Sequence, residues 1–119
     1  GATGGFLAVA LGAFAAHALR ARLDEYARGI FDTAVQYHFV HAVALLFVGL
    51  LWTGQPSSTL LRSSGWFFLV GTVVFSGSLY LLAVTGTRWL GAVTPVGGLA
   101  FLAGWACLAA AAWEVLPAP

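Results

Sequence analysis

Three histidines stand in segments that otherwise carry almost no charge, and their imidazoles could do several kinds of chemistry. His38 and His41 are three residues apart, so a helix would place both on one face, as two ligands of one metal ion require. His17 could supply a third ligand. The alternatives are hydrogen bonding between helices and proton transfer near neutral pH. We expect the hydrogen-bonding role and assign no metal and no cofactor.

Hydroxyl side chains form a second candidate group. Thr72, Ser76 and Tyr80 recur at every fourth residue, which places them on one helix face. A polar face inside a membrane must meet protein or a water-filled cavity rather than lipid, so an open cavity there would be a conduit for a small solute or an ion. Alternatively, the Ser and Thr hydroxyls bond to carbonyls one turn earlier in their own helix, and this is the arrangement that we expect.

A proline lies close to these hydroxyls. Pro95 follows Thr94 in an apolar run, and a proline removes a backbone donor and can break a helix. Broken helices bind ions in some transporters, although a proline near the beginning of a helix more often only starts or kinks it. The hypothetical binding cluster therefore comprises His17, His38, His41, Ser76, Ser78, Tyr80 and Thr94. No strand–turn–helix pattern surrounds Ser76 or Ser78, so neither is a hydrolase nucleophile.

The distribution of charge shows which elements must position these residues. The chain of 119 residues has five basic and four acidic side chains, and 61% of its residues are hydrophobic. Six of the nine charges fall within residues 20–32, and the runs between charges are each close to the ~20 apolar residues that cross a bilayer. We predict an all-α integral membrane protein, a four-helix bundle that forms a single domain over residues 1–119. The predicted spans are 2–19, 36–53, 64–84 and 90–114.

The charged segment 20–36 is predicted to form a short amphipathic helix at the membrane surface, because its apolar residues keep a helical period. Alternating topology places this connector, the histidines, the Ser76–Tyr80 turns and Thr94 in the same half of the membrane. We therefore expect any site to lie beneath the connector. The connector would then be a candidate lid for that site.

The small residues of the first span, the net charge and the cysteine count limit what the protein could bind. Gly5, Ala8, Gly12 and Ala16 recur at three- and four-residue spacing, which predicts a close helix contact within the bundle or between protomers. A net charge of +1 without lysine gives no basic face for nucleic acid. The single cysteine, Cys107, excludes an internal disulfide and a multi-cysteine metal site.

Several motifs in order resemble those of a known family. They are Gly12-Ala13-Phe14-Ala15-Ala16-His17-Ala18-Leu19, Phe31-Asp32, Tyr37-His38-Phe39-Val40-His41-Ala42, Phe75-Ser76-Gly77-Ser78-Leu79-Tyr80, Thr94-Pro95-Val96-Gly97-Gly98 and Gly104-Trp105. Together they resemble the small membrane proteins grouped as domain of unknown function 423, which are similar to the transmembrane protein 256 family of animals. The resemblance covers nearly the whole chain and implies a four-span integral membrane protein. It brings no activity, cofactor or catalytic residue to any position here.

These observations favour one function over two others. We expect a multi-pass protein of the bacterial inner membrane that is not an enzyme and that acts as an assembly or interaction component. Its partners would be the lipid bilayer and either further copies of itself or another membrane protein. The alternatives are the conduit along the polar face and metal binding by the histidines.

Overall fold

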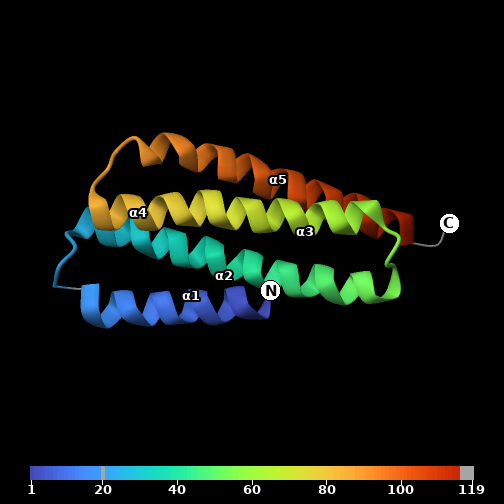
Figure 1. Ribbon diagram of the computed structural model, residues 1–119, viewed down its shortest axis with the longest axis horizontal. Coiled ribbons are helices and arrows are strands. Elements are labelled where there is room, and N and C mark those ends of the chain that lie inside the picture. The colour runs from blue at the N-terminus through green and yellow to red at the C-terminus, as the bar shows by residue number, and fades with distance from the viewer. Residues whose placement is uncertain (20, 116–119) are drawn as a thin grey trace.

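The computed structural model describes residues 1–19 and 21–115, and these form an elongated bundle of helices, 55 Å along its longest axis (Figure 1). In chain order the elements are α1 (Ala2–Phe14), η1 (Ala15–Leu19), α2 (Glu25–Gly54), α3 (Thr59–Gly71), η2 (Thr72–Ser76), α4 (Gly77–Thr85) and α5 (Leu90–Val115). The elements η1 and η2 are π-helical turns that continue their neighbours, so the described chain runs as four long helices. All four are long and apolar enough to cross a membrane. The predicted all-α membrane bundle is confirmed.

Local sequence explains where the helices begin and end. Asp24 caps α2 by accepting a hydrogen bond from the Ala27 amide at 2.8 Å, and Ser58 caps α3 through the Leu61 amide at 3.3 Å. At the other end of the third span, α4 stops at Gly86, whose φ of 68° is left-handed and suits glycine. Polar capping residues and a glycine therefore divide a nearly uniform apolar sequence into hairpins.

The charged connector differs from the prediction. Residues 25–36 are helical, but they are not a separate amphipathic helix, because α2 runs without interruption from Glu25 to Gly54. His38 and His41 therefore lie near the middle of α2, about 20 Å or more from its first residue, rather than at the start of a span. The Asp24 cap accounts for the difference, since it fixes the helix start at Glu25, eleven residues before the predicted span.

The helices α3 and α5 form the tightest seam of the bundle, and each places aromatic rings on the glycines of the other. A Cβ added at Gly97 would overlap the backbone of Phe75, and one added at Gly71 would lie 2.5 Å from the ring of Phe101. A third pair brings Phe68 to within 2.6 Å of the position that a Cβ would take on Gly104. These contacts place Phe68 and Phe101 in the main apolar core, together with Val48 and Leu61.

The first span packs differently. It runs antiparallel to the first part of α2, with Gly1 beside Leu46 and Gly12 beside Val35 (Figure 1). Only 11% of the most apolar stretch of this span is buried, against 28–33% in the other three. The first helix is thus attached along one side, whereas the other three enclose the core.

Candidate functional site

His41 lies in the centre of the bundle with both ring nitrogens occupied. Its Nδ1 is 2.8 Å from the Tyr37 carbonyl, which can only accept a hydrogen bond, so Nδ1 carries the proton. Nε2 then accepts the indole N–H of Trp105 on α5 at 3.2 Å. The ring also stacks on Phe101, with centroids 3.4 Å apart and planes inclined by 10°. His41 therefore connects α2 to α5 as a neutral, fully bonded group with no lone pair left for a metal.

His38 lies one turn away and faces other helices. Its Nδ1 is 3.3 Å from the hydroxyl of Tyr80 on α4, and the Tyr80 ring packs against Phe31 with centroids 4.8 Å apart. The other nitrogen, Nε2, lies 3.7 Å from the position that a Cβ would take on Gly4 of α1. His38 is thus held between the first and third spans and bonds to the third.

His17 does not join the other two histidines. It is an exposed residue of η1, whereas His38 lies against Gly4, and thirteen helical residues separate Gly4 from His17 by about 20 Å. Within residues 1–19 and 21–115, no group of three His, Cys, Asp or Glu side chains could hold a metal ion. The geometry therefore gives no support to the three-histidine metal site.

The hydroxyl residues are used mainly for internal bonding. Ser78 bonds to Thr94 across α4 and α5 at 2.8 Å and also donates to the Phe75 carbonyl, at 2.9 Å. Thr72 donates to the Phe68 carbonyl, at 2.8 Å, as expected for a hydroxyl that bonds within its own helix. Ser76 is different: it is only 1% exposed, and its hydroxyl is the single buried side-chain polar atom without a partner in the described part of the chain.

Pro95 does not break the last span. The helix α5 continues through it from Leu90 to Val115, and the Pro95 ring is exposed on its surface. The Thr94 hydroxyl lies 3.3 Å from the Leu90 carbonyl one turn earlier. A continuous helix and a buried Ser76 give no support to a conduit along the Thr72–Tyr80 face.

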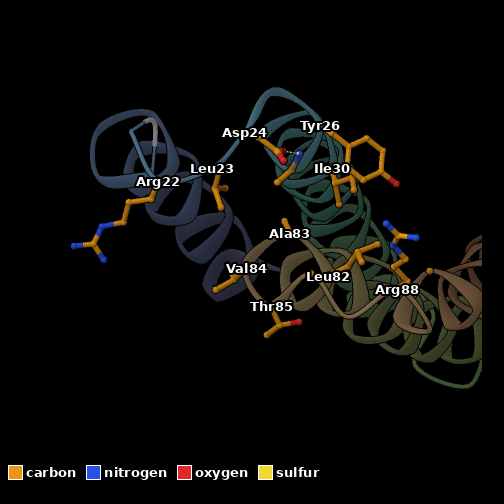
Figure 2. Close-up of a pocket in the computed structure, with 13 residues that line it drawn as sticks. Arg22, Leu23, Asp24, Tyr26, Ile30, Leu82, Ala83, Val84, Thr85 and Arg88 are labelled. Atoms are coloured by element: carbon orange, nitrogen blue, oxygen red, sulfur yellow. Dashed lines mark hydrogen bonds between the residues drawn. The ribbon is translucent and has the colours of Figure 1, made fainter.

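Sequence reasoning placed a site beneath the connector, and the structure has a hollow at that end of the bundle (Figure 2). It has a volume of about 640 Å³ and lies between the start of α2, the end of α4 and the start of α5. None of the seven residues of the predicted cluster lines it. The residues that do include Arg22, Asp24, Tyr26, Thr85 and Arg88. The sequence does contain a signal for this hollow, the arginines at the ends of the predicted spans, but they were used only to delimit the spans and the charged connector.

The predicted small-residue stripe of the first span is divided between two faces. Ala8 is fully buried, and Gly12 lies against Val35, so both meet α2. A Cβ on Gly5 would meet nothing within 4 Å, and Ala16 is exposed. Gly4, which was not included in the prediction, completes the inner face: a Cβ there would lie 3.2 Å from that of Ala42.

Comparison with known proteins agrees with this architecture. Residues 11–98 match the family model described as Protein of unknown function (DUF423). The chain is 41% identical to the UPF0382 membrane protein YwdK of Bacillus subtilis over 116 residues, which are 98% of this chain and 94% of that protein. It is 43% identical to the UPF0382 inner membrane protein YgdD of Escherichia coli over 107 residues, 90% and 81% of the two chains.

A third relative, the UPF0382 membrane protein of Haemophilus influenzae, is 43% identical over 108 residues, 91% of this chain and 86% of that one. No solved structure matches the chain. The expected multi-pass, bacterial inner-membrane location is confirmed by these relatives and by the four spans. The resemblance of the motifs is confirmed as well, and the chain belongs to the DUF423 family.

Proposed function

We propose that the protein is a non-catalytic component of a membrane assembly, and that its first span contacts a further transmembrane helix. The observation that carries this proposal is the unequal burial of the spans, 11% in the first and 28–33% in the others. A helix held on one side leaves most of its surface to lipid or to a partner. The first span is therefore the part of the fold that is best placed to form an additional helix contact.

The composition of that free surface supports the proposal. Ala2, Val9, Ala13 and Ala16 are exposed and are separated by seven, four and three residues, so they form one stripe on the helix. We call this set the outer stripe. Three of its four side chains are alanine, and small side chains let helix backbones approach closely in lipid, where association depends on packing. The partner is a second copy of the chain or another membrane protein.

The central polar groups support a structural rather than a catalytic role. A catalytic base needs a free lone pair within reach of a substrate proton, but His41 uses both nitrogens inside the bundle. Ser78 and Thr94 bond to each other. These interactions fix the positions of α2, α4 and α5, and they explain His41, Ser78 and Thr94 at membrane depth without a reaction.

Cysteine cross-linking in native membranes tests the proposal. Cys107 is first replaced by alanine, and one cysteine is then placed at Ala13 on the outer stripe or, as a control, at Leu102, which is 67% exposed on α5. We expect a cross-linked product from Ala13→Cys only. A product of twice the chain mass identifies a second copy, and a product of another mass identifies a different protein. Cross-linking from Leu102→Cys alone, or from neither, would overturn the proposal.

A further inference from the structure

The hollow at the connector end is a mixed apolar and cationic site at the edge of the membrane. Its volume of about 640 Å³ falls within the range of small-ligand sites in proteins. It opens where α4 ends at Thr85 and α5 begins at Leu90. Trp89, in the turn between them, is 66% exposed, and exposed tryptophans mark the level of the lipid headgroups. The hollow is therefore at the depth where a phospholipid changes from chain to headgroup.

The walls and the rim of the hollow have different chemistry. Leu23, Ile30, Leu82 and Ala83 give apolar walls, while Arg22 and Arg88 supply the positive charge. Figure 2 shows the two arginines on opposite sides of Leu82 and Ala83, with Arg22 extending outward from the connector. Because the arginines come from two separate turns, the folded bundle is needed to bring them to one hollow.

The carboxylates at this end of the bundle compensate the arginines only in part: Asp24 lines the hollow, and Glu25 follows it outside the lining. The Asp24 carboxylate accepts the Ala27 amide as the helix cap, at 2.8 Å. Arg28 lies 3.4 Å from the backbone carbonyl of Asp24 through its Nε. Asp24 is the one carboxylate among the residues of the hollow, against two guanidinium groups. Among the described residues that line it, the hollow therefore carries an excess of one positive charge.

We propose that this hollow binds an anionic phospholipid of the surrounding leaflet. Its phosphate lies at the arginine rim, and its glycerol and first methylene groups lie against the wall formed by Leu82 and Ala83. Guanidinium groups bind phosphate with strong, charge-assisted hydrogen bonds, and basic pockets between transmembrane helices bind acidic headgroups. A free phosphate ion would leave the apolar wall unused, and a zwitterionic lipid would not compensate the excess charge.

The test measures phosphatidylglycerol bound to the whole purified protein in detergent, by native mass spectrometry during a lipid titration. We expect one tightly retained lipid on the unmodified chain. Arg22→Gln and Arg88→Gln should each weaken binding about fivefold, since an arginine near an anionic surface contributes about that factor. The matched control is Arg62→Gln, at the far end of the bundle, which should bind as the unmodified chain does. Val84→Trp fills the hollow from an exposed position. It should abolish retention of the lipid although every charged side chain is still present.

Two further arms identify the source of the phosphate. Phosphatidylcholine should be retained far more weakly than phosphatidylglycerol, and excess inorganic phosphate at constant ionic strength should not displace the lipid. Equal binding by Arg88→Gln, Arg62→Gln and the unmodified chain would overturn the proposal. Retention that survives Val84→Trp, displacement by inorganic phosphate, or equal retention of the two lipids would overturn it as well.

Discussion

The seam between α3 and α5 and the seam between α1 and α2 both depend on glycine, yet they hold their helices very differently. In the first seam, each helix inserts a phenylalanine ring onto a glycine of the other, at Gly71 and Gly104, and Gly97 lies against the backbone of Phe75 in η2, which continues α3. In the second, Gly12 faces Val35, and Gly4 faces Ala42 and, farther away, the edge of the His38 ring. Interlocking aromatic rings bury large areas and fix register, whereas small residues facing one another allow close approach with little area. Glycine thus allows an interlocked core between α3 and α5, whereas between α1 and α2 it allows only an attachment along one side of α1.

The largest effect should come from the α3–α5 seam. Gly97→Leu would force the new side chain into the Phe75 backbone, and overpacking of a close contact costs about 1–3 kcal/mol or more. We expect the upper end of that range, because backbone cannot move aside as a flexible side chain can. Thermal unfolding in detergent, followed by helical circular dichroism, measures the loss. Gly49→Leu, at a position with nothing within 4 Å, is the control, and an equal loss in both variants would contradict the interlocked seam.

The next effect should come from His41. His41→Ala removes a ring that stacks on Phe101 and leaves the Trp105 indole without its acceptor, so we expect a loss of about 2–4 kcal/mol. His17→Ala, at an exposed position, should leave the free energy of unfolding unchanged. Added Zn²⁺ should stabilise neither the parent nor the variants. The opposite result would be a rise in the unfolding temperature with Zn²⁺ that disappears in both variants. It would support the three-histidine metal site, for which the geometry gives no support.

A smaller effect is expected where the first span meets α2. Gly4→Leu places a side chain where a Cβ already lies 3.2 Å from that of Ala42. Because α1 is held along one side, it can tilt away, so the loss of global stability should stay below about 1 kcal/mol. Exchange of α1 amide hydrogens should rise while exchange in α5 stays constant. A loss as large as that of Gly97→Leu would show that the two seams are equivalent, contrary to the comparison.

The smallest effect should come from Ser76. Its buried hydroxyl has no partner among residues 1–19 and 21–115, so Ser76→Ala should be neutral or stabilise by up to about 1 kcal/mol. Ser64→Ala is the matched change, because the Ser64 hydroxyl donates to the Gly104 carbonyl at 2.9 Å in the α3–α5 seam. It should destabilise by about 1 kcal/mol. Destabilisation by Ser76→Ala alone would mean that its hydroxyl has a bonded partner in the membrane.

Much of the fold could be predicted from the sequence, because each charge-free run has the length of one span. The start of α2 could not, since periodicity cannot distinguish a surface helix from an extension of the next span when their apolar faces are continuous. The Asp24 cap decides that question. The depth of His38 and His41 follows from it, which is why these residues were expected nearer the membrane surface.

The candidate site was less accessible to prediction. Topology placed a candidate site at the connector end, where the structure has a hollow, but none of the predicted residues lines that hollow. For the stripe Thr72–Ser76–Tyr80, helical spacing left two arrangements open, bonding within the helix and a path for a solute. Whether a hydroxyl lines a cavity or bonds within its helix depends on rotamers and neighbouring rings, such as Phe75 against Tyr37 at a centroid distance of 4.5 Å. Such pairings join residues far apart in the chain, so helical spacing cannot reveal them.

If the first span is the association helix, as we propose, changes to it should alter the mass of the assembly in mild detergent. Ala13→Trp obstructs the outer stripe, and Ala109→Trp makes the same change at an exposed position of α5. Native mass spectrometry should show a complex larger than one chain for the unmodified protein and for Ala109→Trp, and a single chain for Ala13→Trp. An unchanged complex in Ala13→Trp, or its loss only in Ala109→Trp, would show that the chain does not associate through its first span.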